Sequence, residues 1–170
     1  MLDKMLNILL NEDELGAVVR AHILIEQYVD HFLSLVVPNH DYLDKMSIDF
    51  SNKVKLAVAM GLDEEIYKPI NSITSIRNKF AHRANFKLDS SDVKSFYDSF
   101  VAEDREGIQD IISNNPDRPA GLAEKYSRLF IKEKLVVMVI FLAIRIESEV
   151  KFELDYALEK IDDSKDEIDA

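Results

Sequence analysis

Arg77 and His82 are the two residues whose types and spacing could do chemistry in this chain. They lie near the end of residues 73–83, a stretch that is otherwise compatible with a helix. An arginine offers a fixed positive charge and a histidine exchanges protons near neutral pH, and together they can cleave a phosphodiester without a metal. Spacing alone favours a structural interpretation instead, with Arg77 in a salt bridge and His82 at a helix end.

Composition indicates one domain with its own core, because 47% of the 170 residues are apolar. The absence of cysteine excludes disulfides and thiolate zinc sites, and it suits a reducing cytoplasm. Residues 1–5 do not resemble a signal peptide. The apolar run 135–144 is about half the length needed to cross a bilayer. We therefore expect a cytoplasmic protein without a membrane segment, in which residues 135–144 form a buried helix.

The charge is spread unevenly along the chain. A net charge of −11 opposes general binding to nucleic acid. Residues 66–88, however, contain no Asp or Glu, and this locally positive stretch surrounds the Arg/His pair with Lys68, Lys79, Arg83 and Lys87. Residues 159–170 are rich in Asp and Glu, which predicts a flexible acidic tail after a single domain at residues 1–158.

The pattern of apolar residues predicts an all-α protein. Only four Gly and four Pro occur, and no alternating runs with hairpin turns are present. The polar segment 102–121 is expected to be a loop or insertion around a short helix at 108–112. Apolar residues recurring at three- and four-residue steps predict the other helices, at residues 2–10, 13–36, 50–60, 69–82, 92–100, 120–130 and 132–158.

Local signals set the expected limits of the central helices. Ser51 is the expected N-cap of the helix at 50–60, Gly61 its stop, and Pro69 the first residue of the helix that carries Arg77. Around the helix axis, Arg77 lies about 40° from Ile73, which belongs to the apolar stripe of this helix. The aliphatic part of the Arg77 side chain can therefore lie along the edge of the core. His82 falls off that stripe, at or past the helix end. The stripe consists of Ile70, Ile73, Ile76 and Phe80.

Residues 77–82, Arg-Asn-Lys-Phe-Ala-His, resemble the R-x4-6-H motif of the HEPN superfamily. Members of this superfamily often carry a polar residue directly after the arginine, and here that residue is Asn78. Residues 50–62, taken together with 76–82, are also similar to the mannitol operon repressor family, which falls in the same helical class. The resemblance covers residues 18–100 and, more loosely, the final helix.

The resemblance implies an up-and-down bundle of four to six helices that pairs as a symmetric dimer and brings two motifs to one cleft. Many such proteins are metal-independent ribonucleases of toxins or antiviral defence, and others are non-catalytic regulatory modules. Transferred to this chain, Arg77 would stabilise charge on the scissile phosphate, and His82 would transfer a proton. Asn78 would hydrogen-bond the substrate or position the other two residues.

Two functions remain open from the sequence. One is a dimeric endoribonuclease of toxin or defence type, with RNA bound by Lys79, Arg83 and Lys87, and with an antitoxin or other regulatory protein as a possible further partner. The other is a non-catalytic transcriptional regulator of the mannitol operon repressor type, which acts through protein contacts. Glu26 is expected to hold Arg77 in place. His22 and Glu26 have no third partner at metal-ligand spacing, and no nucleotide-binding motif is present, so we expect neither metal nor cofactor.

Overall fold

The computed structural model describes residues 2–83, 85–115 and 118–168, with side chains for the same ranges except residues 2–3, 44 and 157–168. Within these ranges the chain forms eight α-helices, two 3-10 helices and no strand, which confirms the all-α prediction. The elements are α1 (Leu2–Asn11), α2 (Glu14–Val36), α3 (Asp41–Lys45), α4 (Phe50–Ala59), η1 (Glu64–Ile66), α5 (Tyr67–His82), α6 (Ser90–Asp98), α7 (Ala102–Ser113), η2 (Tyr126–Arg128) and α8 (Ile131–Ile168).

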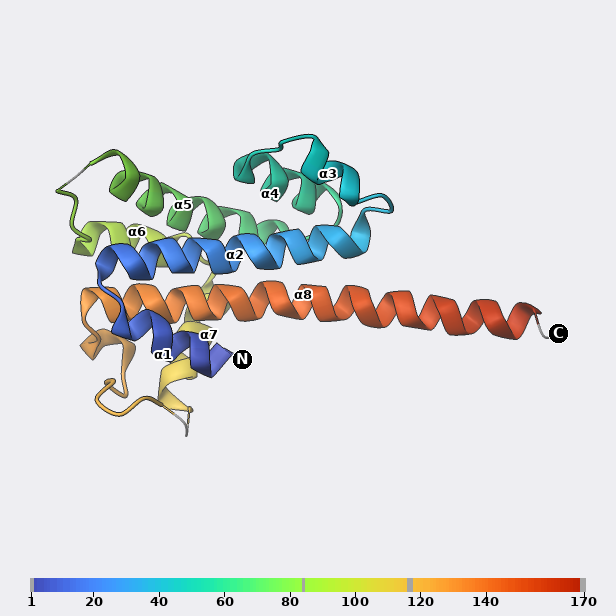
Figure 1. The fold of residues 1–170 in the computed structure, drawn as a ribbon. Coiled ribbons are helices and arrows are strands. Elements are labelled where there is room, and N and C mark those ends of the chain that lie inside the picture. Colours follow the sequence, from blue (N-terminus) through green and yellow to red (C-terminus); the bar gives the residue numbers. More distant parts are fainter. Residues whose placement is uncertain (1, 84, 116–117, 169–170) are drawn as a thin grey trace.

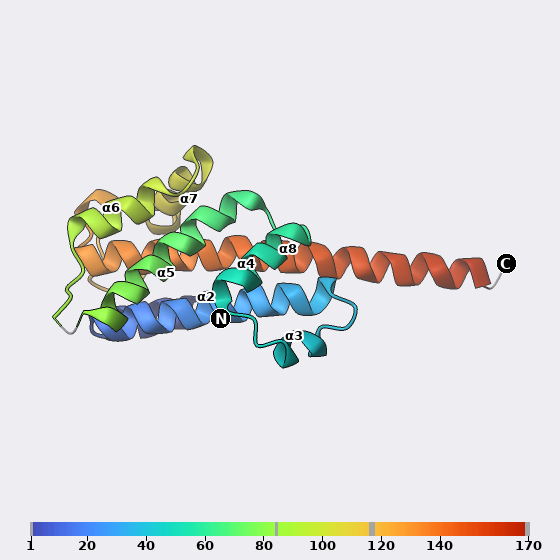
Figure 2. The same ribbon diagram turned by 90° about the horizontal axis from the view of Figure 1, so that it is seen from above.

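Helices α2 and α8 form the centre of the molecule, where they lie side by side and run in the same direction (Figure 1). Helices α1 and α7 pack on α8, α4 and α5 pack on α2, and α6 contacts both α5 and α8. Figure 2 shows that α5 crosses this centre obliquely. Every residue from 135 to 143 on α8 is buried, as the apolar run predicted. Each large side chain buried there stabilises the fold by about 2 kcal/mol.

None of the described helices combines the length and the apolar character that crossing a bilayer would require.

The first turns of α2 and α4 are capped by aspartates. Asp13 accepts a hydrogen bond from the Gly16 N–H at 2.7 Å, and Asp49 accepts one from the Asn52 N–H at 3.0 Å. The prediction of Ser51 as the cap of α4 was wrong by two residues, because the Asp49 carboxylate satisfies the same free N–H groups and also interacts favourably with the helix dipole. Gly61, at φ 114°, ends α4 in the left-handed conformation, as expected.

Helix α5 begins two residues before the predicted start, so Pro69 is its third residue. The reason is that η1 leads directly into α5, and the Tyr67 N–H donates to the Glu64 carbonyl. Proline is tolerated there because the first N–H groups of a helix lack partners within the helix. The helix ends at His82, and Arg83 has extended backbone angles.

The segment between α6 and α8 differs most from the prediction. Residues 102–113 form the continuous helix α7, and residues 120–130 contain only the short η2. Helix α7 packs on α8 at Gly107, where a Cβ atom would lie 2.5 Å from Cε2 of Phe141. The absence of that atom permits the close approach. Residues 116 and 117 of the predicted loop lie outside the described residues.

Helix α8 is longer than predicted and ends at Ile168 rather than near residue 158. It projects beyond the other helices in Figure 1. No Gly or Pro follows residue 131 in the sequence, so no residue interrupts the helix. The helix therefore continues into the acidic segment 159–170, of which residues 169 and 170 lie outside the described residues.

Candidate functional site

Arg77 lies in the C-terminal half of α5 and is exposed. Its Nη1 donates to Oδ1 of the neighbouring Asn78 at 3.3 Å. Among the described side chains, no carboxylate lies within 4 Å of its guanidinium, whereas Arg20 pairs with Glu12 at 2.7 Å. Arg77 thus presents a positive charge that an anion can approach, with the polar side chain of Asn78 beside it.

His82 is exposed in the last turn of α5. It lies five positions after Arg77 on the same α-helix, so the two side chains leave the axis about 140° apart. His82 lies on the opposite side of the helix from Ile73, which is fully buried in the core. A single chain therefore does not direct Arg77 and His82 toward one point.

His22 of α2 is the histidine that the fold places beside Arg77. It is only 9% exposed, and its ring packs edge-on against Phe50 of α4 with the ring centroids 4.7 Å apart. Its Nε2 is buried and has no hydrogen-bond partner in the described part of the chain. Burial, and to a smaller extent the positive charge of Arg77, lower the pKa of His22 below its ordinary value. His22 is consequently neutral at pH 7.

Glu26 lies one turn after His22 on α2 and contacts that residue rather than Arg77. Its Oε2 is 3.9 Å from Nδ1 of His22, which is too long for a direct hydrogen bond. Glu26 could hold Arg77 in place only if their helices were in contact, and α2 and α5 do pack together. None of the described carboxylates, that of Glu26 included, lies within 4 Å of the Arg77 guanidinium.

The three basic residues predicted to bind RNA lie in different environments. Lys79 forms an ion pair with Asp92 of α6, whose side chain is 3% exposed and which also completes the capping box of that helix. Lys79 therefore joins α5 to α6. Arg83 and Lys87 are exposed in the connection between these two helices.

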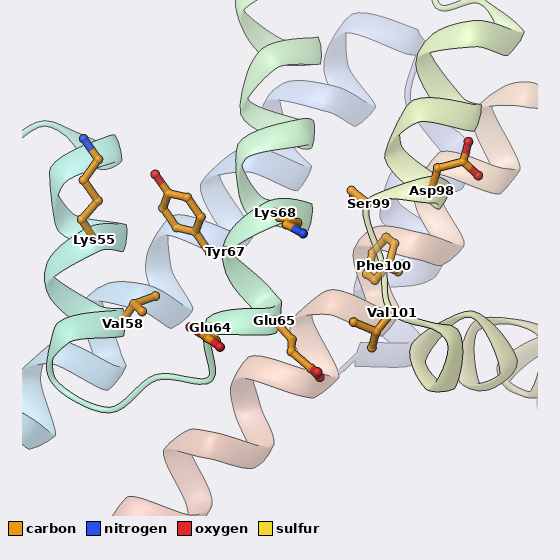
Figure 3. A pocket seen from close by; sticks show the side chains of 10 residues that line it. All are labelled: Lys55, Val58, Glu64, Glu65, Tyr67, Lys68, Asp98, Ser99, Phe100 and Val101. Carbon is orange, nitrogen blue, oxygen red and sulfur yellow. The ribbon is translucent and has the colours of Figure 1, made fainter.

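One open cavity among the described residues is separate from the Arg77 region. It has a volume of about 650 Å³ and lies at the other end of α5, where Lys68 is about 13 Å along the helix from Arg77. In Figure 3 the carboxylates of Glu64 and Glu65 turn to one side of the opening, and the Tyr67 hydroxyl turns toward Lys55. Acidic and basic groups are mixed around this cavity, so it does not favour a polyanion.

No family model, curated protein or solved structure matches this chain. Function must therefore be inferred from the side chains themselves. Among the described residues, no group of three or more His, Asp or Glu side chains is arranged to hold a metal ion.

Sequence reasoning identified Arg77, Asn78 and His82 but did not place His22 near Arg77. The available signal was the pair His22 and Glu26, four residues apart on one helix, which indicated a partly buried polar cluster. Its proximity to Arg77 depends on the packing of α2 against α5, which the spacing of residues along the chain does not reveal.

Proposed function

We propose that this protein is a metal-independent endoribonuclease of the HEPN type that acts as a homodimer. The observation that carries the proposal is the exposed guanidinium of Arg77, which contacts Asn78 and has no carboxylate partner among the described residues. A guanidinium in this state is suited to bind a phosphate with two hydrogen bonds. The chain contains 32 acidic residues, yet none of the described carboxylates forms an ion pair with this guanidinium.

In the proposed reaction, the ribose 2′-hydroxyl attacks the adjacent phosphorus while His82 accepts the hydroxyl proton or donates a proton to the leaving group. The bond from the 2′-oxygen to phosphorus forms, and the bond to the 5′-oxygen breaks. The leaving oxygen takes up a proton, and a 2′,3′-cyclic phosphate remains. Arg77 stabilises the charge that develops on the phosphate oxygens, and Asn78 positions the guanidinium. The attacking hydroxyl restricts the reaction to RNA.

A second copy of the chain supplies the missing half of this site. Because Arg77 and His82 diverge on α5, we assign Arg77 of one subunit and His82 of its partner to one phosphate. Such pairing explains why two exposed residues on different sides of one helix can serve one reaction.

The surface that we assign to the second copy is the α2 stripe, which consists of Leu15, Val19 and Ile23. These residues are 49%, 37% and 47% exposed, recur every four residues and lie on the same helix as His22. Arg20 and Glu26 lie on the same helix, so a two-fold axis can oppose basic and acidic side chains across the contact. Burial of the α2 stripe in the dimer would remove apolar surface from water.

A regulator that acts through protein contacts is the second candidate. The observation that favours it is the net charge of −11, which repels RNA from most of the surface and attracts basic protein partners. In this case Arg77 and His82 would contact a protein partner rather than a phosphate.

The deciding experiment incubates total RNA in EDTA with wild type, Arg77→Ala and His82→Ala, and with a mixture of the two variants. Wild type should cleave and leave cyclic phosphate ends, and each variant alone should be inactive. In the mixture, each heterodimer keeps one intact composite site, so about a quarter of wild-type activity should return. Lys151→Ala, an exposed change on α8, serves as the control and should cleave normally.

Failure to recover activity in the mixture, with both variants still dimeric, would show that each chain supplies both residues. If no protein cleaves RNA although all are dimeric, the ribonuclease proposal fails and the regulator is favoured.

A further inference from the structure

Residues 125–134 carry a positive charge that contrasts with the acidic chain. This stretch contains Lys125, Arg128, Lys132 and Lys134 against the single acid Glu133, a net charge of +3 in a chain of −11. Tyr126 and Phe130 alternate with these basic residues. Basic side chains interleaved with aromatic ones are typical of surfaces that bind single-stranded nucleic acid.

The fold arranges aromatic rings and cations in this region next to each other. Tyr126 of η2 stacks on Tyr97 of α6 with the ring centroids 5.1 Å apart and the ring planes at 25°. Lys134 lies over the Tyr126 ring at 5.7 Å, and Arg105 of α7 lies over the Tyr97 ring at 6.0 Å. These separations are within the range of cation–π attraction, so the four side chains stabilise one another.

Hydrogen bonds hold both tyrosines in place. The Tyr126 hydroxyl donates to Sδ of Met138 at 3.4 Å, and the Tyr97 hydroxyl accepts from Nε2 of Gln109 at 3.1 Å. The two rings therefore form a rigid surface. Because they are already ordered, a ligand that binds against this surface has a lower entropic cost of binding.

An open cavity of about 580 Å³ adjoins the tyrosine pair. Gln109 and Ser113 of α7 line it together with Lys125 and Lys134, and Glu124 and Ser127 complete the lining. A smaller cavity of about 190 Å³ shares Tyr97, Tyr126 and Lys134 with it. The larger volume is within the usual range for sites that hold a small organic ligand, and its lining combines amide, hydroxyl and ammonium groups.

Phe130 is the most exposed large apolar side chain among the described residues, at 78%. It directly precedes α8, next to Ile131, which lines the smaller cavity. The Phe130 ring makes few contacts within the chain. A planar base can therefore stack on this ring without disrupting packing contacts of the fold. Stacking on an aromatic ring accepts every base, since each base has a π-face.

We propose that this surface binds single-stranded nucleic acid. We call it the η2–α8 patch, and it comprises Tyr97, Lys125, Tyr126, Arg128, Phe130 and Lys134. Phe130 stacks on one base, the cavity beside the tyrosine pair holds a neighbouring nucleotide, and Lys125, Arg128 and Lys134 neutralise phosphates. Lys132 is not part of the patch, because its ammonium group donates to the carbonyls of Leu10 and Glu12 at 2.8 and 2.6 Å.

This binding site goes beyond the proposed function and does not depend on chemistry at Arg77. Helix α6 separates the two regions. Its Asp92 pairs with Lys79 of α5, and the next residues, Val93 and Lys94, line the smaller cavity of the patch. A strand on the patch therefore lies about one helix width, roughly 10 Å, from the end of the motif helix. If the protein cleaves RNA, the patch would hold the substrate strand outside the reacting site.

The test measures fluorescence anisotropy of a labelled 12-nucleotide oligouridylate with 2′-O-methyl groups, which cannot be cleaved through the 2′-oxygen. Wild type should bind at low salt. Phe130→Ala should weaken binding roughly tenfold because one stacked base is lost. The double variant Lys125→Ala/Arg128→Ala should reduce the slope of log K against log salt by about 1.4, since each contact to a single strand contributes about 0.7.

Matched controls are Phe152→Ala and Lys151→Ala, exposed residues of the same types on α8. Both should bind like wild type, and circular dichroism should show that all variants are folded. Unchanged affinity for Phe130→Ala together with an unchanged salt slope for the double variant would overturn the proposal. Absence of oligonucleotide binding would also overturn it, and binding of labelled polyglutamate instead would assign the patch to an acidic protein.

Arg77→Ala distinguishes this inference from the proposed ribonuclease. It should bind the oligonucleotide like wild type whether or not wild type cleaves RNA. If RNA is cleaved but the patch variants bind the oligonucleotide like wild type, the ribonuclease stands and the patch fails. If the patch variants lose binding but no RNA is cleaved, the patch stands and the ribonuclease fails.

Discussion

His22 of α2 lies beside Arg77 of α5, close enough for the positive charge of the arginine to lower the pKa of the histidine. Burial has the larger effect on this pKa, because an imidazolium at 9% exposure loses most of its hydration. The charge of the candidate site thus acts on a buried histidine that resists protonation. This pair links the stability of the α2–α5 contact to pH.

Stability should fall on acidification because of His22. Its pKa is lowered in the folded state and stays near 6.5 in the unfolded state, so below about pH 6.5 the unfolded state binds more protons. This contribution is fully present above pH 6.5 and is lost as pH falls toward the folded pKa, by at most about 1.4 kcal/mol per pH unit. Urea unfolding of wild type and His22→Gln between pH 5 and pH 8 measures it.

The wild-type free energy of unfolding should decrease more steeply toward pH 5 than that of His22→Gln, and the exposed His31→Gln on the same helix should follow wild type. Equal slopes for wild type and His22→Gln would contradict the assignment. In nuclear magnetic resonance titrations, Arg77→Met should raise the pKa of His22, since it removes one of the two causes of the shift.

Charges placed in the α2 stripe should separate the dimer. In Val19→Glu/Ile23→Glu, like charges and unpaired carboxylates would be buried against the partner, which should raise the dissociation constant about a thousandfold or more. Sedimentation velocity measures the change. Leu154→Glu is the control, because Leu154 on α8 is 37% exposed, like Val19. A double variant that stays dimeric would place the interface elsewhere.

Loss of Lys79 should cost more stability than loss of Lys94. Both lysines form ion pairs with aspartates, but the partner of Lys79, Asp92, has a side chain only 3% exposed, and the partner of Lys94, Asp98, is 47% exposed. Lys79→Met leaves a buried carboxylate without its cation, which should destabilise the fold by about 1–2 kcal/mol because Lys79 itself is partly exposed.

Lys94→Met should cost no more than about 0.5 kcal/mol, the usual value for an exposed pair on one helix. Thermal and urea unfolding compare the two variants under the same conditions. Similar losses for both would mean that the Lys79–Asp92 pair has no special role in joining α5 to α6.

A methyl group at Gly107 should push α7 away from α8. The added Cβ would lie 2.5 Å from the ring of Phe141, which is almost fully buried and cannot move aside freely. Gly107→Ala should therefore destabilise the protein by about 1–3 kcal/mol, although alanine is the better helix former. Urea unfolding measures the loss.

The double variant Gly107→Ala/Phe141→Leu tests the cause of that loss. The smaller side chain makes room for the methyl group, so the double variant should lose less stability than the sum of the two single changes. Additive losses would show that the contact between residues 107 and 141 is not responsible.

Local sequence signals were sufficient for most helices. The 3.6-residue period and the scarcity of Gly and Pro placed α1, α2, α4 and α8 near their observed starts, because these preferences act between residues at most a few positions apart. Arg77, Asn78 and His82 were found in the same way, from types and spacing along one helix. The angle between Arg77 and His82 also follows from helix geometry, since both residues belong to α5.

Contacts between distant residues required the tertiary structure. His22 and Arg77 are far apart in the chain, as are Tyr97 and Tyr126, and no periodic pattern connects the members of either pair. Only residues 108–112 of helix α7 were predicted to be helical, because its polar sequence gains stability from packing on α8 at Gly107, which is not a local property. The environment of each candidate residue thus depends on how the helices pack, whereas the presence of the helices depends mainly on their own residues.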